Sequence, residues 1–270
     1  MTAGNARNIL ITGGCGRIGT LLARKLAGSY AVTLLDCRRP PPDLNLPFVC
    51  ANIAEAHFLN SGFDGFDTVF HLAADPRPRA QWESLFPNNV AGTHNVVQAT
   101  CAAKCRRLIF ASSLHAVLGY PSTTYVHSRL PARPVTAYGV SKALGESIAK
   151  AYADCCDTSI ICVRIGAVLA PDSEHLTPRN PRLELVITER DVMALLTACI
   201  EATLTDGCKV VHGVSLQGRH RFDMQEASDL LGFQPHDNAY VMAWVNFRAM
   251  QRKLYRGYRV LRRSKHRSAA

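Results

Sequence analysis

The sequence lacks the features of membrane-spanning and secreted proteins. No apolar run approaches the roughly 18 residues that a membrane span requires, and the polar residues 1–8 do not have the basic-then-apolar order of a signal peptide. Of the 270 residues, 19% are charged and 47% are hydrophobic. This balance excludes a disordered or collagen-like chain and is typical of one large globular core. We therefore expect a cytoplasmic protein without two full domains.

Cysteine pairs with metal-ligand spacing are also absent. The ten cysteines include no Cys-x-x-Cys pair, which is the usual sequence sign of a structural zinc site or a redox motif. Cys101 and Cys105 lie one helical turn apart, but no second pair or nearby histidine would complete a metal site with them. We expect reduced, mostly buried thiols and no bound metal.

Acidic residues are missing from the C-terminal end. The formal net charge is +10, and residues 248–267 contain nine Lys or Arg and no acid, so the remainder of the chain is near neutral. The nine are Arg248, Arg252, Lys253, Arg256, Arg259, Arg262, Arg263, Lys265 and Arg267. We interpret residues 241–270 as a basic amphipathic helix and tail with a solvated charged face. Contact of this tail with membrane lipid, nucleic acid or an acidic partner is the alternative.

Short β-branched apolar runs alternate with longer helical patterns through the first two-thirds of the chain. This alternation predicts an α/β fold with a doubly wound parallel sheet. The expected strands are Asn8–Thr12, Ala31–Leu35, Phe48–Cys50, Thr68–His71, Arg107–Ser112, Ser159–Arg164 and Lys209–His212. The expected helices are Ile18–Leu26, Trp82–Lys104, Tyr138–Cys155, Glu189–Thr203 and Met224–Leu231. After Arg164 the pattern loosens, which predicts a small second lobe where open α/β sheets bind their ligands.

A glycine-rich segment directly follows the first expected strand. Gly13, Gly16 and Gly19 stand between that strand and a helical pattern. Glycines allow the backbone to turn tightly and to approach a pyrophosphate, which the free N–H groups at a helix N-terminus can then bind. The segment therefore predicts a dinucleotide site.

An acidic residue stands at the end of the second expected strand. Asp36 lies 17 residues after Gly19, where a carboxylate can accept hydrogen bonds from ribose hydroxyls and would repel a 2′-phosphate. This favours NAD over NADP. Arg38 and Arg39 follow at once, and because a guanidinium there could hold the extra phosphate, NADP stays the alternative.

A tyrosine and a lysine stand four residues apart in a predicted helix. Tyr138 and Lys142 therefore share one helix face. A nearby ammonium favours phenolate and lowers the tyrosine pKa toward working pH, so that Tyr138 could take a proton from a substrate hydroxyl. Ser113 follows the fifth expected strand, where its hydroxyl could hydrogen-bond the reacting oxygen.

These segments together resemble the extended short-chain dehydrogenase/reductases, also called the NAD-dependent epimerase/dehydratase family. The resemblance extends to about residue 237 and includes Thr12–Gly19, Asp36, His71–Ala74, Asn89–Thr93, Ser113, Tyr138 and Lys142. It implies a Rossmann-type sheet, a homodimer, and a triad in which Tyr138 is the base, Ser113 orients the substrate oxygen and Lys142 assists both. It also implies NAD contacts for Gly13, Gly16, Arg17, Ile18, Gly19, Asp36, Asn52, Ile53, Leu72, Ala73, Ala74, Tyr138 and Lys142.

Within this family the chain is most similar to the uronate dehydrogenases, which oxidise C1 of a hexuronic acid with NAD. The chain is short for a nucleotide-sugar epimerase, and its Ser112–His115 resembles a segment of uronate dehydrogenases. The resemblance implies that His115 contacts the sugar and that Arg179 or Arg182 holds its carboxylate.

Three positions depart from the uronate dehydrogenase pattern. Leu114, Ala167 and Pro76 stand where that family places polar residues of the substrate pocket. A pocket without these hydrogen-bonding groups would not compensate for the desolvation of the same polyhydroxylated ligand. The departures therefore indicate a different or less polar substrate.

The expected organisation is an NAD-binding Rossmann domain over residues 1–165, a small substrate-binding lobe over 166–240 interleaved with the core, and the basic segment over 241–270. We predict an NAD-dependent oxidoreductase that transfers hydride from a sugar or sugar-acid hydroxyl to NAD. One alternative is an epimerase or dehydratase that retains NAD. The other is a non-catalytic dinucleotide-binding protein with a basic anchoring tail.

Overall fold

Seven parallel strands form the central sheet. The computed structural model describes residues 7–55, 62–204, 207–216 and 221–252. The strands are β1 (Asn8–Thr12), β2 (Ala31–Asp36), β3 (Phe48–Cys50), β4 (Thr68–His71), β5 (Arg107–Ser113), β6 (Ser159–Ile165) and β9 (Cys208–Gly213). Their spatial order is β3-β2-β1-β4-β5-β6-β9, and each pairing is parallel. The predicted α/β fold with a Rossmann-type, doubly wound sheet is confirmed.

Alternation of side chains explains why both faces of this sheet are covered. Ile9 and Ile11 of β1 join one apolar cluster, whereas Leu10 between them joins another. Successive side chains of a strand point to opposite faces, and all three are almost fully buried. A strand that is buried on both faces needs a continuous apolar run, which is the pattern from which β1 was predicted.

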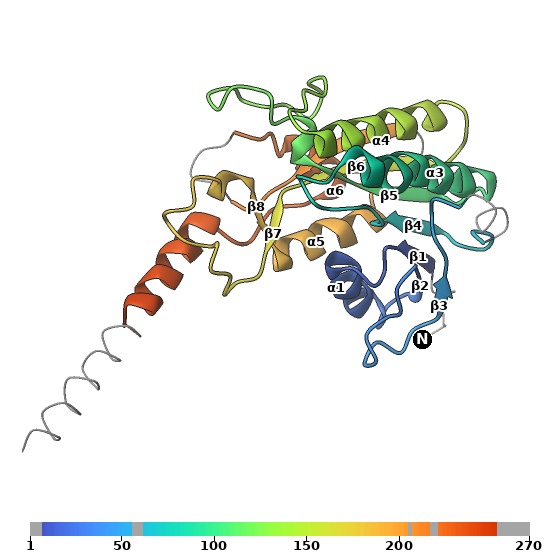
Figure 1. Ribbon diagram of the computed structural model, residues 1–270. Helices are drawn as coiled ribbons and strands as arrows, with labels where there is room; N and C mark the ends of the chain where they lie inside the picture. The colour runs from blue at the N-terminus through green and yellow to red at the C-terminus, as the bar shows by residue number, and fades with distance from the viewer. Residues whose placement is uncertain (1–6, 56–61, 205–206, 217–220, 253–270) are drawn as a thin grey trace, which may run out of the picture.

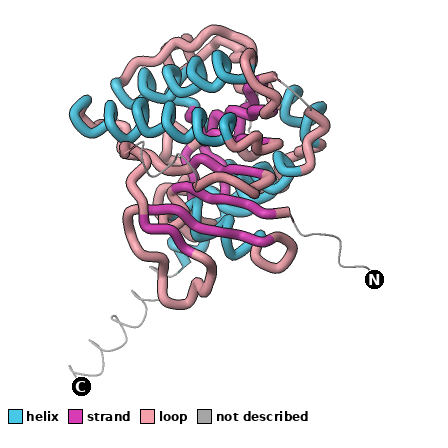
Figure 2. Tube along the Cα trace, turned by 90° about the vertical axis from the view of Figure 1, so that its right-hand side faces the viewer, coloured by secondary structure: helices cyan, strands magenta, loops and turns pink. Residues whose placement is uncertain are grey.

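Helices lie on both faces of the sheet (Figures 1 and 2). On one face, α3 (Gly92–Ala102) and α4 (Ala137–Ala153) contribute to the cluster of Leu10. On the other face, α1 (Arg17–Leu26), α5 (Glu189–Ile200) and α6 (Gln225–Leu231) contribute to the cluster of Ile9 and Ile11. Among the helices of the described ranges, none combines the length and the apolar character needed to cross a membrane.

The predicted helix Trp82–Lys104 is interrupted. The chain forms α2 (Trp82–Leu85), a π-helical turn η2 (Phe86–Ala91), and only then α3. Pro87 has no N–H to donate to the preceding turn, and the π turn stands where that regular helical hydrogen bond is missing. The turn places Asn89 inside the molecule, where its Oδ1 accepts a hydrogen bond from the Asp75 N–H at 2.7 Å.

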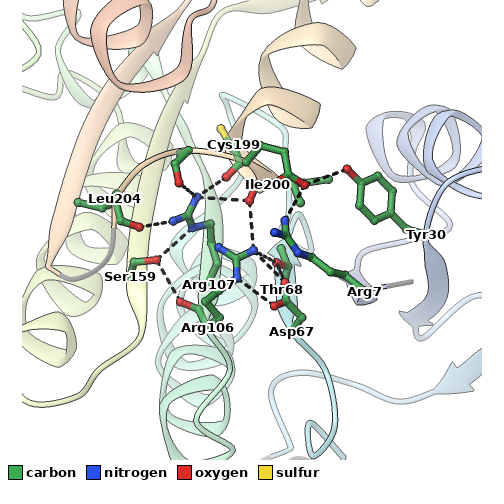
Figure 3. A network of polar contacts seen from close by, with 12 residues as sticks. Arg7, Tyr30, Asp67, Thr68, Arg106, Arg107, Ser159, Cys199, Ile200 and Leu204 are labelled. Atoms are coloured by element: carbon green, nitrogen blue, oxygen red, sulfur yellow. Dashed lines mark hydrogen bonds and ion pairs between the residues drawn. The ribbon is translucent and has the colours of Figure 1, made fainter. Parts of the chain in front are cut away.

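A buried arginine holds the start of β5 against the end of α5 (Figure 3). Arg107 is 1% exposed. Its guanidinium donates to the main-chain carbonyls of Cys199, Ala202 and Leu204. These carbonyls follow or belong to the last turn of the helix, where no intrahelical donor is available. Helix α5 therefore ends at Ile200 rather than at the predicted Thr203.

After β6 the chain leaves the main sheet and returns to it. Strands β7 (Ala167–Leu169) and β8 (Val186–Thr188) form a separate two-stranded sheet, with the 3-10 turn η4 (Leu183–Leu185) before β8. A last helix occupies 239–252 within the described residues. The division into residues 1–165, 166–240 and 241–270 stays a prediction, and the predicted basic tail from Lys253 onward lies outside the described residues.

Candidate active site

The carboxyl ends of the strands border a cavity of about 1000 Å³. It lies beside β1 and β4, the neighbouring strands at which the strand order reverses. At such a point successive connections diverge to opposite faces of the sheet and leave a crevice for a ligand. Of all the predicted cofactor, catalytic and substrate residues, only Arg179 is absent from the cavity lining.

The glycine loop forms one wall of the cavity with its backbone. Gly13 has φ +71°, and a Cβ at this position would lie 2.5 Å from the main-chain nitrogen of Ala73. Helix α1 begins at Arg17, and its N-cap residue, Gly16, offers no side-chain acceptor to the first N–H groups of the helix. Free N–H groups at a helix N-terminus favour an anion. A pyrophosphate therefore fits this wall.

Asp36 ends β2 beside the glycine loop. Its side chain is only 5% exposed, and its Oδ2 accepts a hydrogen bond from the Cys15 N–H at 3.0 Å. Its Oδ1 accepts one from the Arg38 N–H at 3.0 Å, and the Arg38 guanidinium lies 3.5 Å away with a side chain that is 67% exposed. The buried carboxylate of Asp36 can accept hydrogen bonds from a ribose diol. The long, exposed side chain of Arg38 lies beside it at the edge of the cavity.

The other predicted cofactor residues complete this end of the cavity. Leu72, Ala73 and Ala74 follow β4 and line the cavity directly beside the glycine loop. Arg17 donates to the Val168 carbonyl at 2.9 Å, which ties the start of α1 to β7. Ile18, Gly19, Asn52 and Ile53 also line the cavity. A cradle without side chains at the helix N-terminus and a carboxylate at the end of β2 together fit NAD.

Tyr138 and Ser113 meet at the other end of the cavity. Ser113 is the last residue of β5, and Tyr138 lies in the first turn of α4. Thr136 fixes the start of α4, because its Oγ1 accepts a hydrogen bond from the Gly139 N–H at 3.0 Å. Burial raises the pKa of Tyr138 to about 12, against a smaller lowering by a side-chain hydrogen bond with Ser113.

Lys142 lies close to Tyr138, and its surroundings bear on the expected pKa of that tyrosine. Its Nζ donates to the Ala111 carbonyl at 2.8 Å and lies 5.9 Å from the centre of the Tyr138 ring. Burial lowers the pKa of Lys142 to about 8. Burial raises the pKa of Tyr138 above 10, so the expectation that Lys142 brings it below that value is wrong.

His115 and Arg182 line the cavity beyond Tyr138. The His115 ring packs edge-on against the Tyr138 ring, with centroids 5.4 Å apart. Its Nδ1 is buried without a hydrogen-bond partner, and burial together with the charge of Arg182 lowers the pKa of His115. Arg179 is instead directed at Phe247, with its guanidinium 5.9 Å from the ring centre. The structure thus brings Arg182, and not Arg179, to the cavity.

Sequence reasoning missed a buried ion pair below the triad. Arg164 at the end of β6 contacts Glu146 of α4 at 2.8 Å, and both side chains are less than a tenth exposed. Ser112 also donates to Glu146. Glu146 follows Lys142 by one helical turn, so the pair joins β5, α4 and β6 beneath Ser113 and Lys142. The spacing of Glu146 from Lys142 was the available signal, but its partner on another strand could not be read from it.

His71 is held as a neutral ring beside the cavity. It hydrogen-bonds Thr12 Oγ1 at 2.8 Å and Thr93 Oγ1 at 3.0 Å, and complete burial lowers its pKa to about 3. A neutral, doubly hydrogen-bonded imidazole connects β1, β4 and α3 rather than transferring protons. Across the described part of the chain, no three His, Cys, Asp or Glu side chains gather as a metal site would require.

Comparisons with known proteins agree with this geometry. A model of the NAD dependent epimerase/dehydratase family matches residues 9–189. The NAD-dependent glucose-6-phosphate dehydrogenase of Haloferax volcanii is 32% identical over 257 residues, covering 86% of this chain and 94% of that protein. The uronate dehydrogenase of Agrobacterium fabrum is 31% identical over 236 residues, covering 86% of each chain.

A solved structure extends the likeness to three dimensions. The crystal structure of a uronate dehydrogenase variant from Agrobacterium tumefaciens, complexed with NAD, has a TM-score of 0.79 and 28% sequence identity. The match covers 90% of this chain and 89% of that one. The family model spans the glycine loop, Asp36, Ser113, Tyr138 and Lys142. The chain therefore belongs to the NAD-dependent epimerase/dehydratase family, as its motifs predict.

Proposed function

We propose that the protein is an NAD-dependent dehydrogenase that oxidises a hydroxyl group of a sugar or sugar acid. The observation that carries the proposal is the convergence of Ser113, Tyr138 and Lys142 on the cavity that the glycine loop and Asp36 also line. Its relatives include an NAD-dependent glucose-6-phosphate dehydrogenase and uronate dehydrogenases, which supports a sugar hydroxyl as the reacting group.

In the proposed reaction, Tyr138 accepts the proton of the substrate hydroxyl while hydride leaves the same carbon. Ser113 hydrogen-bonds the reacting oxygen and orients it toward Tyr138. Bound NAD would supply the hydride acceptor. A base must be deprotonated to act, and Lys142, whose pKa is about 8, is mostly protonated at neutral pH and so stabilises the phenolate. Its bond to the Ala111 carbonyl keeps the ammonium in place.

We propose further that the substrate carries an anionic group, a carboxylate or a phosphate, that Arg182 holds. Arg182 lines the cavity near His115, and its charge acts on that ring. Pro76 and Ala167 line the cavity as apolar surfaces. Leu114 is 1% exposed and packs in an apolar cluster with Val117 and Phe222, so this departure from the uronate dehydrogenase pattern leaves little apolar surface facing the ligand.

The test is the appearance of reduced nicotinamide when the purified protein meets NAD and a panel of hexuronic acids, hexose phosphates, neutral aldoses and simple secondary alcohols. We expect turnover of an acidic sugar. Tyr138→Phe should abolish turnover and leave NAD binding intact, because the substitution removes only the hydroxyl. Retained turnover in this variant would exclude Tyr138 as the base.

The same panel tests the two alternative functions. An epimerase or dehydratase would hold NAD that co-purifies and would give no net reduced nicotinamide. A non-catalytic binding protein would bind NAD and transform no member of the panel. The hydroxyl, phenol and ammonium at one cavity favour catalysis over the non-catalytic alternative, since binding NAD alone needs no base.

We also propose a homodimer in the cytoplasm. Trp82 of α2, Phe86 of η2, and Val140 and Leu144 of α4 are large apolar side chains that are 39% to 51% exposed. The Trp82 and Phe86 rings lie 6.0 Å apart, Val140 and Leu144 share one face of α4, and exposed apolar patches mark interfaces. Light scattering on a sizing column should give twice the chain mass, and Val140→Glu with Leu144→Glu should halve it.

The ten free cysteines fit a reducing compartment such as the proposed cytoplasm.

A further inference from the structure

The end of α3 and the segment after α4 bring two thiols together. The Cys156 Sγ lies 2.7 Å from the Cys101 Sγ, across 55 residues of sequence. Cys101 belongs to the last turn of α3, and Cys156 follows the C-cap residue of α4, Asp154, by two residues. A second thiol pair, Cys162 and Cys208, is 3.8 Å apart. The Cys101–Cys156 contact is therefore the tighter of the two.

We propose that Cys101 and Cys156 form a reversible disulfide that joins α3 to the end of α4. An S–S bond is about 2.05 Å long, so the two sulfur atoms need to move together by less than about 1 Å. The two segments that carry them already pack against each other on one face of the sheet, because α3 and α4 share the same apolar cluster.

Both thiols are partly buried, and the order of the chemistry follows from the raised pKa of Cys101. Cys156 is half-buried and follows an exposed neighbour, Cys155, so it can be reached by a small-molecule disulfide such as oxidised glutathione. Its thiolate attacks one sulfur of that reagent, forms a mixed disulfide and releases one glutathione thiolate. Burial raises the pKa of Cys101 to about 12, which makes Cys101 a poor first nucleophile.

Cys101 completes the exchange from within the molecule. Its sulfur loses its proton, attacks the Cys156 sulfur at close range and releases the second glutathione as a thiol. In balance, two protein thiols become one disulfide, and one molecule of oxidised glutathione becomes two of the reduced form. Excess reduced glutathione drives the same steps in the opposite direction.

We expect the Cys101–Cys156 disulfide to raise the stability of the fold and not to reduce activity. The cross-link closes a loop of more than 50 residues that includes β5 and all of α4, and it restricts the unfolded chain over that length. It lies beyond the C-terminal end of α4, whereas Tyr138 lies in the first turn of that helix. We therefore expect oxidation to stabilise the fold and to leave NAD binding unchanged.

The experiment incubates the full chain with oxidised or reduced glutathione, blocks the remaining thiols with iodoacetamide and maps tryptic peptides. Peptide 80–104 contains Cys101 as its one cysteine, while peptide 151–164 contains Cys155, Cys156 and Cys162. After oxidation we expect these two peptides to be linked in the wild type and in Cys155→Ser, which is the matched control. The link should be absent in Cys156→Ser and in Cys101→Ser.

Thermal unfolding gives a second readout on the same samples. Oxidation should raise the unfolding midpoint by roughly 5–10 °C in the wild type and in Cys155→Ser, but not in Cys156→Ser. Equal alkylation of Cys101 with either form of glutathione would overturn the proposal. A link from Cys101 to Cys155 in the Cys156→Ser variant, formed as readily as in the wild type, would overturn it as well. Neither result would bear on the dehydrogenase activity.

Discussion

Two arginines that are three residues apart have different surroundings, and the difference assigns their roles. Arg182 lines the cavity, and its charge contributes to the lowered pKa of His115. The Arg179 guanidinium lies over the Phe247 ring of the last helix. A cation over an aromatic ring of the last helix stabilises local packing. A cation in a ligand cavity can instead bind an anionic group.

Replacement of the two arginines should therefore separate binding from packing. Arg182→Ala should raise KM for the acidic substrate roughly 10- to 100-fold, the loss of one charge-assisted interaction, with a smaller change in kcat. Arg179→Ala is the matched control and should leave KM within about twofold, since a partly exposed ring contact contributes little to binding. Steady-state kinetics on the acidic sugar and its neutral analogue measure both. Equal effects of the two substitutions would refute the assignment of Arg182.

The contacts of Asp36 and Arg38 lead to a second prediction about single residues, which concerns the choice between NAD and NADP. Asp36→Ser removes the carboxylate that repels a 2′-phosphate and leaves the Arg38 guanidinium at the rim. The ratio of kcat/KM for NAD to that for NADP should fall at least roughly 10-fold, because both the attraction to the ribose and the repulsion of phosphate are lost. Adding Arg38→Ala should reverse the gain with NADP. A ratio that stays at the wild-type value would remove Asp36 from the cofactor site.

At the scale of elements, the two ends of the parallel strands have different roles, one in ligand binding and the other in stability. The carboxyl ends form the cavity, while at the amino ends Arg107 of β5 holds the end of α5 (Figure 3). Burial lowers the pKa of Arg107 from its usual value, but its guanidinium satisfies several carbonyls that would otherwise be buried without donors. A residue with this position should affect stability and not catalysis.

Arg107→Met should lower the free energy of unfolding by about 2–4 kcal/mol, because it leaves buried carbonyl groups without donors. Arg106→Met is the neighbouring control. Arg106 pairs with Asp67 at 2.9 Å and also donates to the Ile200 carbonyl at 3.1 Å, but its side chain is 37% exposed, so its loss should cost less, about 1 kcal/mol. Urea unfolding followed by circular dichroism measures both. If the two variants lost the same stability, the buried contacts of Arg107 would not be the cause.

At the scale of the whole molecule, buried neutral histidines couple folding to pH. Burial lowers the pKa of His71 to about 3 and that of His212 to about 4. In the unfolded chain both titrate near 6.5. Below pH 6.5 the unfolded state therefore binds more protons than the folded state, and stability falls as pH falls until the folded-state pKa values are reached.

Between about pH 6 and pH 4 the two histidines should together reduce the free energy of unfolding by roughly 2–3 kcal/mol per pH unit. His212→Asn should lower that slope by about 1.4 kcal/mol per pH unit, since one of the two groups no longer titrates. Urea unfolding at several pH values measures the difference, and the carboxylates cancel because they titrate in both proteins. An unchanged slope in the variant would show that His212 is not kept neutral by the fold.

The sequence by itself determined the fold class, the positions of the seven strands of the main sheet and the family. Continuous apolar runs such as Ile9–Ile11 are needed for strands buried on both faces, and Gly13 is needed where a backbone turn at positive φ contacts Ala73. These requirements act over a few consecutive residues. A pattern of residue types therefore records them directly.

The tertiary structure alone decided what depends on partners far apart in the chain. It separated Arg182 from Arg179, paired Glu146 with Arg164, ended α5 with Arg107, and brought Cys101 to Cys156. It also placed the Tyr138 phenol in an interior where burial raises its pKa. Contacts and desolvation arise from packing between elements, and spacing along the chain carries no record of which distant side chain will fill a given position.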